Sequence, residues 1–282
     1  MSVARVPIAR ILVIAGSDSG GGAGIQADIK TVMALGGHAM TAITAITAQN
    51  TLGVTDVMAV PAAMVLAQID AVLSDIGVDA IKIGMIGSAA VAHAVADRIA
   101  AMPHAVPIVF DPVMVATSGA VLADGDTIVA FERLMALATV TTPNLPELAA
   151  LSGLDDPAAG AAALVARGGG AVLVKGGHAA GTVLTDRLFD TGGVTAWTDS
   201  RIDTRHTHGT GCTLASGIAT GLGQGLPLDR AIPIARRLVR DALLAAPGLG
   251  AGHGPMGHGL ICPTPAGETA VDSGNHPAIS SV

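Results

Sequence analysis

The chain alternates short, uniformly apolar runs with longer segments in which apolar residues recur at helical spacing. The first apolar run, residues 11–15, is typical of a parallel strand buried on both faces, and a helix is predicted to follow from about Ile25 to Leu35. Strands alternating with helices of this length predict an α/β fold with right-handed crossovers and a mostly parallel sheet. Further strands are expected near 39–48, 80–84, 107–111, 138–142 and 171–175, and further helices near 61–76, 88–101, 124–137 and 157–167.

The pattern changes after the last of these strands. Segments 181–188 and 193–198 are rich in Thr and Val around a Gly-Gly turn and predict a short antiparallel edge. Two helices are expected near 210–224 and 228–245. Beyond Pro247 the sequence is dominated by Gly, Pro, His and Ser. We therefore expect one domain over residues 1–250 and a loosely ordered tail over 251–282.

Composition narrows the class of protein. Only 1% of residues are aromatic and the formal net charge is -7, which argues against base stacking and against a phosphate-backbone binder. Two cysteines are too few for a disulfide scaffold. No apolar run reaches the length of about 18 residues that a membrane span needs. The sequence predicts a soluble, cytoplasmic protein without nucleic-acid or membrane partners.

A Gly-rich segment, His208-Gly209-Thr210-Gly211-Cys212-Thr213, opens the helix predicted near 210–224. Glycines let successive N–H groups point at one place, and the helix N-terminus adds about half a positive charge there. These features predict an anion hole for a phosphoryl group. Cys212 would lie in that field, where a thiol pKa is usually lowered, and could accept a proton from an attacking hydroxyl. A tight helix start around a small buried Cys explains the same residues equally well.

A second Gly-rich loop, Gly16 to Gly24, follows the first strand. It lacks the G-x-x-x-x-G-K-[ST] sequence of a phosphate-binding loop, because Lys30 lies inside the following helix. It also lacks a clean dinucleotide fingerprint with its acidic residue. We interpret it as a flexible loop on the substrate side, and an NAD-binding oxidoreductase becomes a remote alternative.

Polar residues also follow other predicted strands, at the edge of a parallel sheet where ligands bind. Asn144 and Glu147 could hold Mg²⁺ through waters or form a plain helix cap, and both can hold at once. Lys175 and Asp111 each end a buried strand. The candidate partner of Lys175 is a phosphate, and that of Asp111 is a metal ion. For both residues, a solvated strand end is the alternative.

The second strand ends at Gln49, whose amide could pair with a heteroaromatic ring. Met85 could pack its thioether against the same ring, although a core position is the commoner one for a methionine at a strand end.

Taken together and in order, these motifs resemble the hydroxymethylpyrimidine/phosphomethylpyrimidine kinases, the thiamine-pathway members of the ribokinase superfamily. The resemblance runs from about residue 11 to 245. The matching blocks are Ala15-Gly16-Ser17-Asp18, Gly22-Ala23-Gly24-Ile25-Gln26-Ala27-Asp28, Thr47-Ala48-Gln49-Asn50-Thr51, Lys82-Ile83-Gly84-Met85, Asp111-Pro112-Val113-Met114, Thr142-Pro143-Asn144-Leu145-Pro146-Glu147, Lys175-Gly176-Gly177-His178 and Thr207-His208-Gly209-Thr210-Gly211-Cys212.

The resemblance implies a ribokinase-like three-layer α/β/α sandwich with a mostly parallel central sheet. It implies transfer of the ATP γ-phosphate to 4-amino-5-hydroxymethyl-2-methylpyrimidine and then to its monophosphate, with Mg²⁺ as cofactor and a homodimer as the common assembly. Carried over by position, the resemblance implies Cys212 as the base, with an anion hole formed by Gly209, Thr210 and Gly211. The residues implied around the pyrimidine are Gln49, Met85, Asp28, Gly16 and Gly22. Those implied at ATP are Lys175, Thr207 and His208, and those at the metal ion are Asn144, Glu147 and Asp111.

Two other functions remain compatible with the residues. A pyridoxal kinase on the same scaffold would use the same phosphate machinery, and only the thiamine function demands a second phosphorylation. A non-catalytic nucleotide or pyrimidine sensor would keep the fold without turnover.

Overall fold

The computed structural model describes residues 8–117, 119–178 and 181–260. One nine-stranded sheet runs through it in the order β3-β2-β1-β4-β5-β6-β7-β8-β9. The six central strands, β2-β1-β4-β5-β6-β7, pair in parallel. At one edge β3 pairs antiparallel with β2, and at the other edge β8 and β9 pair antiparallel. The strands are β1 (Arg10–Asp18), β2 (His38–Gln49), β3 (Val54–Ala59), β4 (Ala80–Ile83), β5 (Ile108–Phe110), β6 (Val140–Thr141), β7 (Ala171–Val174), β8 (Val183–Asp190) and β9 (Gly193–Ser200).

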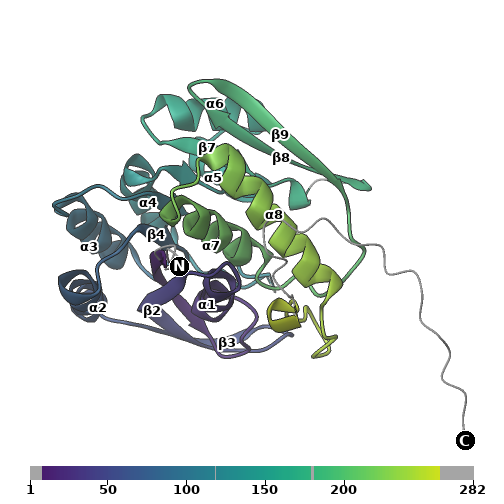
Figure 1. Ribbon diagram of the computed structural model, residues 1–282, viewed down its shortest axis with the longest axis horizontal. Coiled ribbons are helices and arrows are strands. Elements are labelled where there is room, and N and C mark those ends of the chain that lie inside the picture. The colour runs from purple at the N-terminus through teal and green to yellow at the C-terminus, as the bar shows by residue number, and fades with distance from the viewer. Residues whose placement is uncertain (1–7, 118, 179–180, 261–282) are drawn as a thin grey trace, which may run out of the picture.

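Helices cover both faces of this sheet (Figure 1). One buried cluster packs α2 to α6 against one face, and a second packs α1, α7 and α8 against the other. The α/β/α sandwich predicted from the sequence is confirmed. The helices are α1 (Gly24–Ala34), α2 (Ala62–Asp75), α3 (Ala89–Ala100), α4 (Gly125–Leu137), α5 (Leu145–Ser152), α6 (Pro157–Ala166), α7 (Thr210–Gly223) and α8 (Leu228–Leu244), with single 3₁₀ turns η1 (Gly176–His178) and η2 (His258–Leu260).

Small residues bring α7 and α8 unusually close together. A Cβ on Gly217 would lie 2.7 Å from the Cβ of Ala235, and one on Gly221 would lie 2.8 Å from that of Ala231. Two helices can approach this closely only where one of them carries Gly, whose hydrogen takes the place of a Cβ methyl group. The Gly and Ala content of the chain therefore serves packing that fixes α7, the helix whose first turn carries the predicted anion hole.

Two features differ from the sequence-based expectation. Strand β3 was not predicted, and its residues are exposed or half-buried, so the sheet has an antiparallel strand at both edges. The predicted tail also differs in the part that the structure describes, because residues of the stretch 251–260 pack against the body: Met256 and His258 are 4% and 5% exposed. Backbone bonds hold this stretch, among them Gly257 N–H to Ala242 O at 2.9 Å. The rest of the predicted tail lies outside the described residues.

Among the described helices, no single one is long and apolar enough to cross a membrane. Taken together, the bent pair α5 and α6 passes the same test of length and composition.

Candidate active site

A cavity of about 940 Å³ opens at the carboxyl ends of the parallel strands. Its walls come from the loops after β1, β2, β4, β5, β6 and β7 and from the first turn of α7. All of the predicted site residues line it except Gly22 and Asp28. Segments far apart in the sequence therefore meet at one edge of the sheet, as the parallel topology requires.

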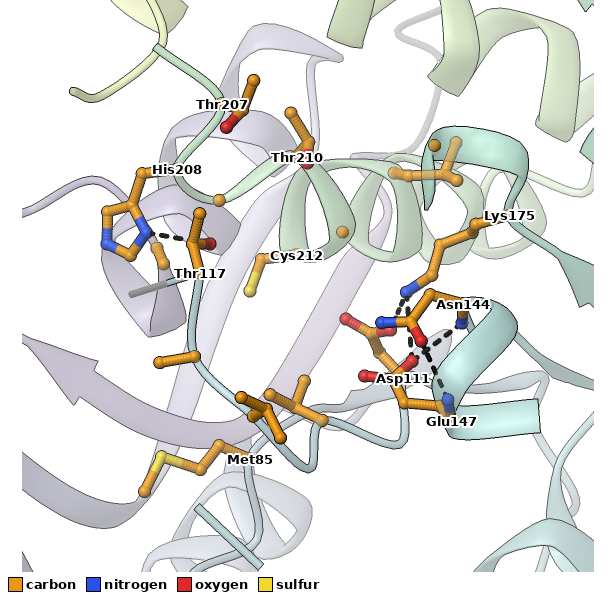
Figure 2. Close-up of a pocket in the computed structure, with 18 of the residues that line it drawn as sticks. Met85, Asp111, Thr117, Asn144, Glu147, Lys175, Thr207, His208, Thr210 and Cys212 are labelled. Atoms are coloured by element: carbon orange, nitrogen blue, oxygen red, sulfur yellow. Dashed lines mark hydrogen bonds and ion pairs between the residues drawn. The ribbon is translucent and has the colours of Figure 1, made fainter. Parts of the chain in front are cut away.

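The first turn of α7 forms the part of the cavity wall that lies between His208 and Lys175 (Figure 2). Gly209 precedes the helix with φ +87°, and no side chain caps the helix. Gly211 faces the charged end: a Cβ there would lie 3.3 Å from Lys175 Nζ and 3.4 Å from Asp111 Oδ2. The Thr210 amide already donates to Thr207 O at 3.3 Å, so it is partly committed to the turn itself. The turn presents backbone and small side chains to the cavity, which suits close approach of an anion.

Cys212 lies between the two ends of the cavity, but its thiol is not in the state predicted from the sequence. Burial raises the pKa of Cys212 to about 11; the Lys82 cation opposes this rise, and the Asp28 and Asp111 carboxylates add to it. The prediction of a lowered pKa is therefore wrong for the unliganded protein. The helix field is outweighed by desolvation and by two nearby carboxylates, so the thiol holds its proton at neutral pH.

At one end of the cavity, Lys175 lies between two carboxylates. Its Nζ is 2.7 Å from Asp111 Oδ1 and 3.8 Å from Glu147 Oε2. Burial lowers the pKa of Lys175, but both carboxylates raise it more, so the amine stays charged. Burial raises the pKa of Glu147, against the attraction of Lys175. This end of the cavity thus combines a fixed cation with two buried carboxylates.

Asn144 and Glu147 form the capping box that was one of their two predicted roles. Asn144 Oδ1 accepts from Glu147 N at 2.9 Å, and Glu147 Oε2 accepts from Asn144 N at 2.8 Å. The Asn144 and Met114 amides both donate to the Glu147 carboxylate, and Lys175 and the Thr142 hydroxyl both bond to Asp111 Oδ1. A metal ion would therefore bind Asp111 Oδ2 and share Glu147 with the two amides. Within the described residues, no three His, Cys, Asp or Glu side chains are placed to hold a metal ion by themselves. Two carboxylate oxygens suit Mg²⁺, which commonly takes its remaining ligands from water and substrate phosphates.

At the other end of the cavity, a hydrogen-bonded group surrounds His208. Its Nε2 lies 2.9 Å from Asp18 Oδ2 and 3.1 Å from the amide nitrogen of Gln49. Asp18 also accepts from the Gly20, Gly22 and Ala23 amides, and although burial raises its pKa, the bonds from His208 and these amides hold it below the usual range. His208, predicted at ATP, thus lies beside Gln49, on the side of α7 away from Lys175 (Figure 2).

Met85 and the backbone of Gly16 form the floor of this same end. A Cβ on Gly16 would lie 2.9 Å from Met85 Sδ, so the thioether packs directly on the strand end. Gly22 does not line the cavity, but its missing side chain makes room for the His208 ring, which a Cβ would approach to 2.5 Å.

The structure adds a residue that the sequence did not single out and corrects another. Lys82, at the end of β4, is completely buried, lines the cavity and binds both oxygens of Asp28 at 2.9 Å. Ser216 donates to the same carboxylate at 2.6 Å. Asp28, predicted to touch substrate, instead lies behind Lys82. The available signal for this pair was a Lys in an otherwise apolar strand, Ala80–Ile83, because a buried cation needs a partner.

Gly209 offers a direct test of the α7 turn. A Cβ at this position would lie 1.9 Å from Gly22 O, in a left-handed conformation that L side chains rarely adopt. We expect Gly209→Ala to displace the turn, to cost about 1–3 kcal/mol of stability and to reduce any phosphotransfer strongly. Urea unfolding and steady-state turnover measure the two effects. Gly168→Ala is the matched control, because Gly168 has φ +86° but no neighbour within 4 Å of a Cβ; equal loss of turnover in both variants would contradict this role for Gly209.

Comparison with known proteins agrees with this geometry. A sequence model of the family described as phosphomethylpyrimidine kinase matches residues 18–257. The hydroxymethylpyrimidine/phosphomethylpyrimidine kinase of Rhizobium meliloti is 48% identical, over 88% of this chain and 96% of its own. The solved phosphomethylpyrimidine kinase of Clostridium difficile superposes with a TM-score of 0.73 at 34% identity, covering 83% of this chain and 99% of that one.

A pyridoxal kinase has the same fold. The enzyme of Staphylococcus aureus, solved in complex with AMP-PCP and pyridoxal, gives a TM-score of 0.81 at 32% identity, covering 90% of this chain and 94% of that one. The family match spans most of this chain and includes both ends of the cavity. The chain therefore belongs to the phosphomethylpyrimidine kinase family, phosphotransferases of ribokinase-like fold.

Proposed function

We propose that this protein transfers the γ-phosphate of ATP to 4-amino-5-hydroxymethyl-2-methylpyrimidine and then to the resulting monophosphate, giving the diphosphate used in thiamine biosynthesis. One observation carries the proposal: the first turn of α7, with Cys212, lies between a polar ring-binding end, where Gln49 contacts His208, and a charged end at Lys175. A substrate alcohol and a nucleotide phosphate entering from opposite ends would meet at this turn.

The ring-binding end supplies orientation. Gln49 offers amide hydrogen-bonding groups to the aminopyrimidine edge, and Met85 offers an apolar wall. His208 and Asp18 hold Gln49 and the Gly16–Gly24 loop in place through the contacts described above. Fixing the ring fixes the hydroxymethyl oxygen near Cys212, which removes most of the entropy cost of the reaction.

The charged end would bind the nucleotide phosphates through Lys175. Lys175 is the candidate partner of the ATP phosphates, with Thr207 at the edge of the cavity, and the Gly209–Cys212 turn holds the transferring group. Asn144, Glu147 and Asp111 would hold Mg²⁺, which when bound neutralises charge that develops on the phosphates. ATP entry would draw Lys175 from Asp111 towards the phosphates and release an Asp111 oxygen for the metal ion.

In the first transfer, the hydroxyl oxygen bonds to the γ-phosphorus, the bond to ADP breaks, and the hydroxyl proton must leave. Cys212 is the proposed acceptor, and because its pKa is raised to about 11, the thiol must first release its own proton to water. The Lys82 cation favours the resulting thiolate. In the second transfer the acceptor is a phosphate oxygen that is already ionised at neutral pH, so no base is needed there.

The test is ATP consumption measured in parallel with the pyrimidine alcohol, its monophosphate and pyridoxal. We expect turnover with both pyrimidines. Turnover with pyridoxal alone would make the protein a pyridoxal kinase, which the likeness to the S. aureus enzyme makes the second candidate. Binding of a pyrimidine without any ATP consumption would make it a sensor. In both cases the proposal would be wrong.

We further propose a cytoplasmic homodimer. Its support is an exposed apolar face on the β2–β3 edge, where Ile46, Val57 and Met58 are 46%, 42% and 60% exposed. The kinase domain would extend through residue 260, since the stretch from 251 packs against α7 and α8.

A further inference from the structure

The C-terminal stretch of residues 248–258, here called the clasp, lies over the ring-binding end of the cavity rather than apart from it. It is anchored on α8, where Gly257 N–H donates to Ala242 O at 2.9 Å, and its Met256 side chain is buried. Nothing in the proposed reaction uses the clasp, although its residues 254 and 256–258 are buried.

The clasp touches three loops of the cavity wall. His253 N–H donates to Thr51 O at 2.9 Å, in the turn that follows Gln49. Gly254 O accepts from His208 N–H at 3.3 Å, immediately before the α7 turn. Pro255 packs beside Gly22, where a Cβ would lie 3.3 Å from the proline Cβ. The clasp thus contacts the turn that follows Gln49, the segment that carries His208 and the loop that leads into α1.

The deepest contact of the clasp is made by His258. Its Nε2 lies 2.8 Å from the Thr213 hydroxyl, and both side chains are buried. The same hydroxyl donates to Gly209 O at 2.9 Å. The Thr213 amide donates to the same carbonyl at 2.9 Å. A hydroxyl that donates to a carbonyl still accepts from a ring N–H, so with the ring proton on Nε2 rather than on the nitrogen that faces the Met256 carbonyl, His258 Nε2–H, Thr213 Oγ1–H and Gly209 O form a chain beside this amide bond. Gly209 is the left-handed residue from which the α7 turn begins.

We propose that His258 is a positioning residue: through the Thr213 hydroxyl it fixes the carbonyl of Gly209 and thereby the direction of the amides at the start of α7. The peptide plane that carries this carbonyl also carries the Thr210 amide. Rotation of this plane therefore changes the direction of an N–H group in the anion hole. Loss of the imidazole would leave the Thr213 hydroxyl free to rotate away from Gly209 O. This inference rests on the proposed phosphotransfer, because it assigns a purpose to the same turn.

Side-chain length gives a sharp test. The amide nitrogen of Gln is as many bonds from Cα as His Nε2, whereas that of Asn matches Nδ1. We expect His258→Ala and His258→Asn to lower kcat about tenfold or more, with the KM for ATP and for the pyrimidine within about threefold of wild type, and His258→Gln to recover most of the loss. Thr213→Val should match His258→Ala, and the double variant should lose little more than either single one. His104→Ala, at an exposed histidine, is the control and should behave as wild type.

Backbone hydrogen exchange of amides 210–214 in the unliganded protein provides a readout that does not depend on turnover. We expect faster exchange in His258→Ala, His258→Asn and Thr213→Val, and wild-type exchange in His258→Gln and His104→Ala. Equal losses in the Gln and Asn variants would show that His258 only fills space and would overturn the inference. So would wild-type exchange and kcat within about twofold in His258→Ala. If the wild type phosphorylates none of the acceptors, the proposed function fails, and the exchange data alone decide the role of His258.

Discussion

Cys212→Ala should lower kcat for the pyrimidine alcohol by about 10²–10⁴-fold, the usual contribution of a positioned general base. The affinity for the pyrimidine should stay close to that of wild type, since the proposed ring contacts are those of Gln49 and Met85. Phosphorylation of the monophosphate should fall much less, because its acceptor oxygen carries no proton that a base must remove. Steady-state kinetics with each acceptor, together with calorimetric binding of the pyrimidine, measure these three quantities.

The control for this variant is Cys212→Ser, which keeps the size of the side chain but replaces the thiol by a much weaker acid. It should resemble Cys212→Ala with the alcohol. Near-normal turnover of the alcohol in Cys212→Ala would remove the residue from the base role. Equal losses with the alcohol and the monophosphate would indicate that the side chain acts on the phosphoryl group and not on the acceptor proton.

Lys82→Met should destabilise the protein by about 3–5 kcal/mol, since it leaves the Asp28 carboxylate buried without its cation. Burial lowers the pKa of Lys82, but the Asp28 and Asp111 carboxylates raise it more; burial also raises the pKa of Asp28, against the attraction of Lys82. The contacts of Lys82 Nζ with both Asp28 oxygens at 2.9 Å are those of an ion pair. The pair also joins β4 to α1, and through Ser216 to α7. The free energy of unfolding in urea measures the loss.

Two further variants make this prediction sharp. Adding Asp28→Leu to Lys82→Met should recover much of the loss, because an apolar pair leaves no buried charge unpaired. Arg98→Met, which breaks the exposed ion pair with Asp70, is the matched control and should cost no more than about 1 kcal/mol. Wild-type stability in Lys82→Met would contradict the ionic description of the pair.

The sequence predicted nearly all of the fold, and all but two of the predicted site residues line the cavity, for a local reason. Parallel strands buried on both faces are uniformly apolar, and each ends at a Gly or polar residue that the next helix follows, as in residues 11–24 and 140–147. Strand β3 was missed because an edge strand with exposed residues has no such pattern. Because parallel strands end at one edge, the motif residues after them had to converge, whatever the details of packing.

The tertiary structure alone decided how these residues are used. The pKa of Cys212 depends on burial and on Lys82, Asp28 and Asp111, which come from three other parts of the chain, so the local helix field gave the wrong direction. Asp28 lies behind Lys82, and His208 lies beside Gln49, because each side chain contacts a partner from a distant element of the chain. The Gly-rich stretch 248–258, in which the sequence showed no motif, contacts the first turn of α7 through His258 and Thr213. Sequence periodicity reports which residues are buried and where elements stop; charge, protonation and contact partners arise only when distant elements share one desolvated volume.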